Sequence, residues 1–399
     1  MYHFSHIVDS LRTSEIRDLM GLATRADIIS FAGGMPNDDL FPIKEIDEIY
    51  NNLPAEIKKT AFQYGPTPGY PPLLESLKLY LRKKGLLVDD NKLLITTGSL
   101  QAINILAKVF VDPNDVVITE NPAFIGAISA FKSYMANILS VPMDKDGIII
   151  EKLKSLLDDK TINPKFVYIT PFFHNPAGVM YSMERRKQLI ELLKDRNIPL
   201  IEDDAYGELY FEEEDKNNMI PVKAMAPKEM TVCYTGSFSK ILGPGMRLGW
   251  MLVPPGIYEK CELCKQSMDA CSPNFTQILA NEFLSQGKLQ DYVASLRVIY
   301  KERKNIMIQA LKKYMPVHPE IHWDEPRGGF YIWISIPENI DATEILKKSI
   351  EKGAVFVVGR TFDPHAKSNH HIRLSFSNTP EQNIAKGVQI IAEALKSFI

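Results

Sequence analysis

A lysine in a segment rich in glycine and serine is the residue of this sequence best suited to covalent chemistry. Lys240 closes the segment 236–240, which reads GSFSK, and Arg247 follows within GPGMRLG at 243–249. A lysine amine can form a Schiff base with an aldehyde, while hydroxyls and a guanidinium can bind a phosphate. The segment therefore predicts a site for a phosphorylated aldehyde cofactor; the alternative is a solvent-facing lysine in a loop.

A carboxylate and a phenol lie together in DDAY at 203–206, after a strand-like segment that begins at Leu200. A carboxylate buried at a strand end needs a cationic partner. For Asp203 that partner would be the protonated pyridine nitrogen of pyridoxal phosphate, and this pairing keeps the cofactor ring an electron sink. Alternatively, Asp203 or Asp204 caps the start of a helix.

Three further segments carry suitable groups after strand-like runs. Gly98 opens a turn into a helix, whose free N–H groups at Ser99 and Leu100 suit a phosphate. Asn175 precedes a proline and could hold an amide beside a ring oxygen. Phe124 could lie against a flat ring. Each of these segments, taken alone, is also explained as a turn or a core position.

The elements that must position these residues alternate in type between about 92 and 255. Short apolar, β-branched runs separated by amphipathic stretches predict parallel strands joined by helices. The expected strands are 93–97, 116–119, 166–170, 200–203, 232–235 and 248–253, and the expected crossover helices are 101–110 and 184–196. Ligands collect beyond the carboxyl ends of such strands, so the residues named above should meet there.

The C-terminal part changes in character. A long helical pattern from about 276 to 315 is broken at Gln286 and Gly287. Two alternating strand candidates at 330–336 and 371–377 are then accompanied by helical segments around 342–352 and 380–396. This order predicts an α+β domain.

Composition argues against several functional classes. The chain of 399 residues has a formal net charge of -3 and no strongly basic tract, so we expect no nucleic-acid binding. Its four cysteines are too few for a disulfide scaffold, and Cys261 and Cys264 fall in a helical pattern, so we expect no metal site. Early charged residues and the lack of a long apolar window predict no signal peptide, no membrane span and a cytoplasmic protein.

Together these segments resemble the fold-type I, class I/II aminotransferases, and more narrowly the branch of 2-aminoadipate and kynurenine aminotransferases. The resemblance covers nearly the whole chain. It rests on the order of FAGGMPN at 31–37, QYGPTPG at 63–69, NPAG at 175–178, DDAY at 203–206, SFSK at 237–240 with Arg247, and HIRLSFS at 371–377.

The resemblance implies an α/β fold with a mostly parallel seven-stranded sheet flanked by helices. It also implies three parts: an N-terminal arm and helix at 1–45 that cover the active site, a large cofactor-binding domain at 46–288, and a smaller α+β domain at 289–399. The cofactor would be pyridoxal 5′-phosphate.

The resemblance further implies roles for individual residues. Lys240 would hold the cofactor covalently and then carry a proton between the substrate α-carbon and the cofactor C4′. Asp203 would face the pyridine nitrogen, with Asn175 and Tyr206 at the ring hydroxyl oxygen and Phe124 on the ring face. The phosphate would be bound by Ser99, the Leu100 N–H, Ser237, Ser239 and Arg247.

Two more roles concern the substrate and the assembly. Arg373 would clamp the substrate α-carboxylate, because a guanidinium fork matches two oxygens in one plane, and Gly34 and Asn175 would assist. Tyr64 would reach the phosphate of the neighbouring subunit, so a homodimer with shared active sites is part of the expectation.

The choice of substrate rests on fewer residues. Arg17 falls where aminoadipate-type relatives carry an arginine on an N-terminal helix over the substrate side chain; the alternative is a solvated arginine. Arg360 is a second candidate, in a segment where relatives more often have proline and glycine. Tyr70, Phe124 and Phe330 could equally line a pocket for aromatic side chains. We expect a 2-aminoadipate, aromatic or broad-range L-amino acid donor, with 2-oxoglutarate as acceptor in a ping-pong reaction.

Two rival functions share the cofactor. A lyase or decarboxylase would use the same lysine motif. A non-enzymatic regulator would carry an N-terminal winged-helix module, whereas the aminotransferase-like pattern begins by about Ser14. His174 we interpret as a turn residue.

Overall fold

The large sheet of the computed structural model contains the strands that the sequence predicts. The structure describes residues 2–5, 7–8, 19, 21, 25 and 27–399. The strand order is β2-β9-β8-β7-β6-β3-β4-β5. The bounds are Lys92–Thr96 for β2, Val116–Asn121 for β3, Asn137–Asp144 for β4, Gly147–Ile148 for β5, Pro164–Ile169 for β6, Leu200–Asp204 for β7, Val232–Ser237 for β8 and Gly249–Val253 for β9.

Most of these strands pair in parallel. β8, β7, β6, β3 and β4 form the parallel succession, whereas β9 runs antiparallel to both β2 and β8, and β5 runs antiparallel to β4. The expected mostly parallel, seven-stranded sheet is confirmed, with the two-residue β5 added at one edge. Sequence pattern does not predict β4, since only Ile138 and Val141 of its residues are buried and it includes Pro142.

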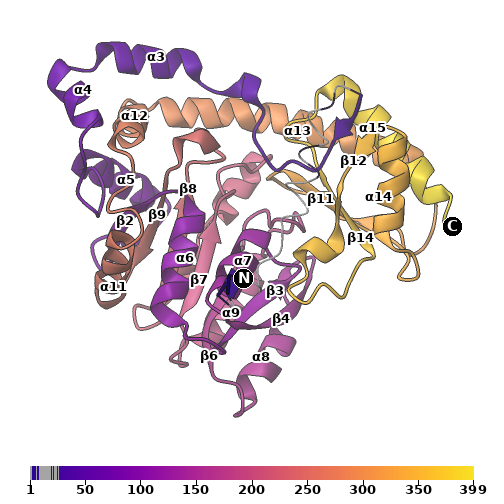
Figure 1. Cartoon of the computed structure of the whole chain (residues 1–399), viewed down its shortest axis with the longest axis horizontal. Coiled ribbons are helices and arrows are strands. Elements are labelled where there is room, and N and C mark those ends of the chain that lie inside the picture. The colour runs from indigo at the N-terminus through magenta and orange to yellow at the C-terminus, as the bar shows by residue number, and fades with distance from the viewer. Residues whose placement is uncertain (1, 6, 9–18, 20, 22–24, 26) are drawn as a thin grey trace.

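Helices cover both faces of the sheet (Figure 1). On one face, α6 (Ser99–Phe110), α7 (Ile125–Ser133) and α11 (Pro255–Gln266) pack through a cluster that includes Phe131 and Cys261. The other face carries α8 (Ile150–Asp158), α9 (Met183–Leu193) and α10 (Val222–Met225). Both predicted crossover helices, now α6 and α9, are confirmed, and Cys261 and Cys264 are helical as expected.

Further helices connect the large sheet to the C-terminal part. α3 (Ile43–Asn52), α4 (Ala55–Ala61) and α5 (Pro71–Lys83) precede β2, and α12 (Asn274–Ser285) is followed by the long α13 (Lys288–Tyr314). Gly287, with a φ of 75°, separates α12 from α13 at the predicted break. None of the described helices combines the length and apolar character that crossing a membrane requires.

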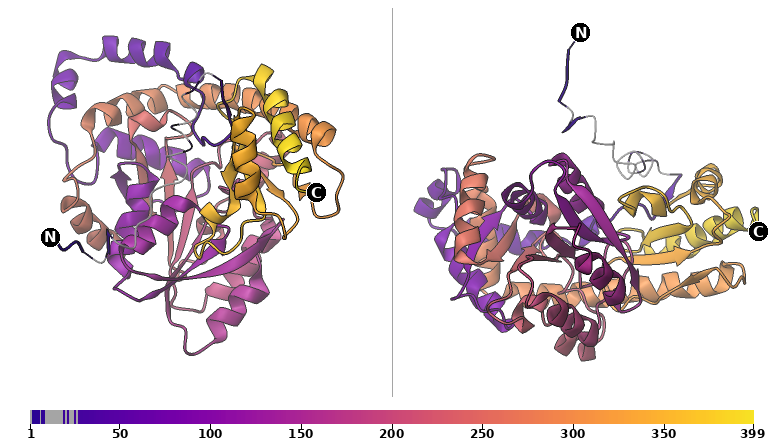
Figure 2. Two further views of the ribbon diagram at one scale, coloured as in Figure 1. Left: turned by 45° about the vertical axis from the view of Figure 1, so that its right-hand side comes forward. Right: turned by 90° about the horizontal axis from the view of Figure 1, so that it is seen from below.

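A second, antiparallel sheet forms the C-terminal part. Its order is β10-β11-β14-β13, with bounds His322–Trp323, Tyr331–Ser335, His371–Ser375 and Val357–Val358. α14 (Ala342–Glu351) and α15 (Glu381–Lys396) belong to this part, and β1 (Ile29–Ser30) pairs with β12 (Ala354–Val355). Figure 2 shows this smaller part beside the large sheet. The predicted strands and helices are confirmed, while the boundaries at 45 and 288 stay predictions.

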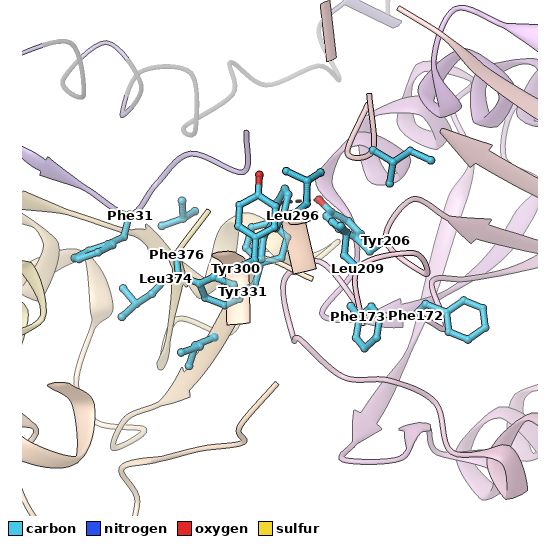
Figure 3. Close-up of a cluster of buried hydrophobic side chains, with 14 of the residues drawn as sticks. Phe31, Phe172, Phe173, Tyr206, Leu209, Leu296, Tyr300, Tyr331, Leu374 and Phe376 are labelled. Carbon is cyan, nitrogen blue, oxygen red and sulfur yellow. Dashed lines mark hydrogen bonds between the residues drawn. The ribbon is translucent and has the colours of Figure 1, made fainter. Parts of the chain in front are cut away.

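A hydrophobic cluster joins the two parts (Figure 3). It contains Phe172 and Tyr206 from the large sheet's loops, Tyr300 from α13, and Tyr331 and Phe376 from the small sheet, all of them buried. The small sheet is thereby held against the loops that follow the carboxyl ends of the parallel strands.

Gly249 brings β9 into direct contact with the start of α6. A Cβ at this position would lie 2.7 Å from the carbonyl carbon of Gly98 and from the nitrogen of Ser99, and 2.8 Å from the oxygen of Gly236. These are backbone atoms, which cannot move aside as a flexible side chain would. Glycine at 249 therefore determines where the N-terminus of α6 lies relative to the loop after β8.

We predict that Gly249→Ala destabilises the protein by about 1–3 kcal/mol, the usual cost of overpacking, and lowers the midpoint of thermal unfolding. The control is Gly256→Ala in α11, where a Cβ has no neighbouring heavy atom within 4 Å. This control should unfold at or above the wild-type temperature, since alanine favours a helix more than glycine does. Equal midpoints for the two variants would argue against the close approach.

Candidate active site

Lys240 lies just beyond the carboxyl end of β8. Its Nζ donates a hydrogen bond to the Gly34 carbonyl at 2.7 Å and lies 5.7 Å from the ring centroids of Tyr206 and Phe330. Burial, assisted by the positive charge of Arg373, lowers the pKa of the amine to about 8. The lowered pKa gives Lys240 a larger share of neutral amine than an ordinary lysine has, and the neutral form is the nucleophile.

Asp203 is a buried carboxylate on β7. Its two oxygens accept hydrogen bonds from Thr235 Oγ1 at 2.7 Å and from Tyr168 Oη at 2.9 Å. Burial raises the pKa of Asp203 to about 6, even though both hydroxyl hydrogen bonds act to lower it. Since the donors on its oxygens are neutral, a bound cation would stabilise the ionised form further.

Asp204 belongs to a different site, because successive side chains of a strand point to opposite faces. Its carboxylate accepts from Tyr234 Oη at 2.7 Å and pairs with Lys84 at 3.0 Å. It also accepts from the Gly207 N–H at 2.8 Å. Since residues 205–208 form a turn and no helix begins there, the helix-capping alternative is wrong for both aspartates.

Hydroxyls and a guanidinium gather where α6 begins. Ser237 Oγ donates to Ser239 Oγ at 2.9 Å. Arg247 Nη2 donates to the Thr97 carbonyl at 3.3 Å and would lie 3.4 Å from a Cβ at Gly98. The first N–H groups of α6, at Ser99 and Leu100, have no carbonyl ahead of them within the helix. This arrangement forms a cradle of donors suited to a phosphate.

A polar network supports the turn before α6. The Thr97 N–H donates to Gln101 Oε1 at 2.7 Å, and Gln101 Nε2 donates to Asp269 Oδ2 at 2.6 Å. Thr97 Oγ1 also donates to Asp269 at 2.9 Å, and the buried Lys265 pairs with this carboxylate at 2.7 Å. Sequence reasoning missed Asp269 and Lys265, since they are more than 160 residues from Thr97 along the chain.

Arg373 is buried on β14 and faces the Asn175 turn. Nη1 donates to Asn175 Oδ1 at 3.0 Å and Nη2 to the Ala32 carbonyl at 2.5 Å. Its guanidinium carbon lies 4.6 Å from the Tyr331 ring centroid and 4.9 Å from that of Phe362. Within the described part of the chain, the buried Nε has no hydrogen-bond partner. An unpaired buried donor on a cation is suited to a carboxylate.

Tyr206 meets a second phenol that the sequence analysis did not single out. The hydroxyls of Tyr206 and Tyr331 are 2.9 Å apart. Tyr331 lies opposite Ser375 in the small sheet, two positions along from the pair formed by Trp333 and Arg373. In the sequence, Tyr331 looks like an ordinary aromatic residue of a buried strand; only its register relative to Arg373 could have indicated a role.

Phe124 and Tyr64 differ in their surroundings. Phe124, partly buried, precedes α7, and its ring lies so close to Gly126 that a Cβ there would be 2.5 Å away. Tyr64 is 86% exposed. Arg17 lies outside the described residues.

Of the aromatic-pocket candidates, Phe330 is fully buried beside Lys240, whereas Tyr70 is partly buried at the start of α5.

His174 forms part of a buried structure around the Asn175 turn. Its Nε2 lies 3.1 Å from Glu120 Oε2, and its Nδ1 accepts from the Ala177 N–H at 3.2 Å. The backbone supports the same turn, with the Gly178 N–H donating to the His174 carbonyl at 2.7 Å. These contacts agree with the interpretation of His174 as a turn residue.

Arg360 lies in a short 3-10 helix at Gly359–Phe362. Burial acts to raise the pKa of Asp341, but hydrogen bonds from Thr343 and Asn369 and the charge of Arg360 lower it overall. The charge of Arg360 therefore acts on the Asp341 carboxylate, which caps the N-terminus of α14.

The residues present fit a pyridoxal phosphate group. The cradle at α6 suits its phosphate, the amine of Lys240 its aldehyde, and the carboxylate of Asp203 a protonated ring nitrogen. Arg373 adds an unpaired donor for the carboxylate of an amino acid. The group would supply an electron sink for charge developed at the substrate α-carbon.

Comparisons with known proteins agree with this chemistry. Residues 26–391 match the sequence model of the family described as aminotransferase class I and II. Aromatic-amino-acid aminotransferase 1 of Thermococcus litoralis is 35% identical over 99% of this chain and 94% of its own length. The 2-aminoadipate transaminase of Thermus thermophilus is 33% identical over 98% of this chain and 95% of its own.

The structure has close counterparts as well. It is similar to the crystal structure of Pyrococcus horikoshii kynurenine aminotransferase in complex with PMP, with a TM-score of 0.94 and 37% identity. The similarity covers 99% of this chain and 97% of the other. The fold is accordingly that of the fold-type I enzymes, and the cofactor is pyridoxal phosphate. The chain belongs to the class I and II aminotransferases.

Proposed function

We propose that this aminotransferase moves the amino group of an aromatic amino acid or of 2-aminoadipate to 2-oxoglutarate in a ping-pong reaction. The observation that carries the proposal is the buried guanidinium of Arg373. Its Nε has no hydrogen-bond partner in the described chain, and its charge adds to burial in lowering the pKa of Lys240. The donors are suggested by the names of the relatives, which refer to aromatic amino acids, 2-aminoadipate and kynurenine.

Lys240 would act first as the cofactor's anchor and then as the acid and base of the reaction. Once the substrate has displaced its amine, that amine can take the proton from the α-carbon and deliver it to C4′. A pKa of about 8 supports this role, because both protonation states are accessible near neutral pH. The Gly34 carbonyl, 2.7 Å from Nζ, would hold the amine on this side of the site.

The remaining residues would hold the ring and the phosphate. Asp203 would pair with the ring nitrogen, and Asn175 and Tyr206 would donate to the ring oxygen, while Phe124 would lie on the ring face. Ser99, the Leu100 N–H, Ser237, Ser239 and Arg247 would bind the phosphate. Arg373 would bind the α-carboxylate with help from Asn175 and Gly34, and its contact with Asn175 at 3.0 Å supports that pairing.

We also propose a homodimer in which Tyr64 completes the phosphate site of the partner. The exposure of 86% supports this placement, since an aromatic side chain so exposed contributes little to its own subunit. A cytoplasmic location is proposed on the four free cysteines at 233, 261, 264 and 271, which suit a reducing compartment.

The pKa of Lys240 predicts how the apoprotein captures its cofactor. The rate of covalent capture, followed by absorbance, should rise with pH around a midpoint of about 8, because only the neutral amine reacts. An ordinary lysine would give a midpoint of about 10.4. Lys223 is the matched control, because burial also lowers its pKa to about 8. Lys223→Gln should keep the midpoint, and Lys240→Ala should abolish capture and borohydride labelling. If Lys223→Gln shifted the midpoint, the assignment of Lys240 as the captured amine would be refuted.

Mixed dimers test the placement of Tyr64. A dimer in which both subunits carry Tyr64→Ala, or both carry Lys240→Ala, should show reduced turnover. Unfolding and refolding the two variants together should restore activity, since one site of a mixed dimer then receives an intact Lys240 and an intact Tyr64. If Tyr64 served its own subunit, every site in the mixture would carry a defect and no activity would return.

A panel of amino donors with 2-oxoglutarate tests the substrate assignment. Arg373→Lys should lower kcat/KM at least about thirtyfold for every donor, because each donor has the same α-carboxylate. Arg17→Ala should lower it only for acidic donors if that arginine recognises the side chain. The exposed Arg82→Lys serves as control. With L-glutamate alone, the bound cofactor should accumulate in its amine form, which a lyase would not produce.

A further inference from the structure

Tyr331 connects residues of the active site that come from both sheets. It belongs to β11 of the small sheet and is 1% exposed. Its hydroxyl is 2.9 Å from that of Tyr206, which follows β7 of the large sheet. Figure 3 shows both phenols in the cluster between the two parts, with Tyr300 nearby.

The ring of Tyr331 also contacts the substrate clamp. The guanidinium carbon of Arg373 lies 4.6 Å from its centroid and 4.9 Å from the ring centroid of Phe362. Such aromatic contacts fix the plane of a guanidinium. The ring of Tyr331 is thus one wall of the clamp, while its hydroxyl points toward Tyr206.

Gly34 allows the hydroxyl of Tyr331 to reach this position. A Cβ at Gly34 would lie 2.1 Å from Tyr331 Oη, so a larger residue would displace the hydroxyl. The same glycine accepts the hydrogen bond of Lys240 through its carbonyl. The close packing therefore brings the phenol pair next to the reactive amine.

We propose that Tyr331 is a positioning residue whose hydroxyl donates to Tyr206 and so directs the single hydroxyl hydrogen of Tyr206 onto the cofactor ring oxygen. The inference rests on the proposed placement of Tyr206 at that oxygen. A phenol has one hydrogen to donate. If Tyr206 gives its hydrogen to the ring oxygen, it can only accept from Tyr331. Hydrogen bonds in such a chain strengthen one another, which stabilises negative charge on the ring oxygen.

The hydroxyl and the ring of Tyr331 make separable predictions. Tyr331→Phe keeps the wall of the clamp and removes only the donor. The pH midpoint of the bound cofactor's absorbance should then rise by about half a pH unit, because negative charge on the ring oxygen is less stabilised. KM for amino donors should change less than about threefold, since the aromatic contact with Arg373 remains.

Phe362→Leu supplies the converse variant. It removes the aromatic contact between Phe362 and the Arg373 guanidinium and leaves both phenols in place. It should therefore raise KM for amino donors and leave the absorbance midpoint unchanged. Gly34→Ala should move the midpoint in the same direction as Tyr331→Phe, because its Cβ displaces the hydroxyl. If Tyr331→Phe folds poorly, Gly34→Ala therefore tests the same hydroxyl.

The controls separate this inference from the placement of Tyr206. Tyr300→Phe removes a buried hydroxyl that is not hydrogen-bonded to Tyr206 or Tyr331, so it should not move the midpoint. Tyr206→Phe should raise the midpoint more than Tyr331→Phe does. If Tyr206→Phe moves it and Tyr331→Phe does not, the role of Tyr331 is overturned while the placement of Tyr206 stands. If neither variant moves it, the placement of Tyr206 is overturned and the role of Tyr331 with it.

Discussion

Lys240 and Arg373 are cations that give their hydrogen bonds to neutral oxygens. Lys240 donates to the Gly34 carbonyl, and Arg373 donates to the Asn175 side chain and the Ala32 carbonyl. Burial lowers the pKa of both groups, and for Lys240 the charge of Arg373 adds to the effect. Within the residues that the structure describes, neither cation pairs with a carboxylate, which leaves a positive potential in the site. That potential both keeps the amine reactive and favours anionic ligands, which here are a phosphate and an α-carboxylate.

The negative charge of the site is kept apart from these cations by the alternation of β7. Asp203 and Asp204 are adjacent in sequence, yet one faces the hydroxyls of Tyr168 and Thr235 and the other faces Lys84 and Tyr234. Lys84 compensates Asp204 on the far face, whereas the neutral hydroxyl donors leave the charge of Asp203 to be balanced by a ligand. A shift of the strand register by one residue would exchange these environments, so the position of β7 in the sheet decides which carboxylate lies among the neutral hydroxyls.

Sequence reasoning located candidate residues where strand end, turn and residue type are all local features. The structure places Lys240 just beyond β8, Asp203 near the end of β7 and Ser99 at the start of α6. Sequence reasoning failed where a role depends on residues distant in sequence. Asp269 supports Thr97 across more than 170 residues, and Tyr331 meets Tyr206 across 125. β4 was missed for a related reason, since pairing with β3, and not a continuous apolar run, keeps it in the sheet.

In the loop that carries the exposed Tyr64, the backbone is held by a buried side chain. Asn274 of α12 donates from Nδ2 to the Gln63 carbonyl at 3.0 Å and to the Thr60 carbonyl at 3.4 Å. A Cβ at Gly65 would lie 2.2 Å from Asn274 Oδ1, so the backbone on both sides of Tyr64 is packed against this one buried amide. A side chain that contacts only solvent would gain nothing from such a constraint. A side chain that binds a second subunit would gain affinity, because a backbone that is already restricted loses less entropy on association.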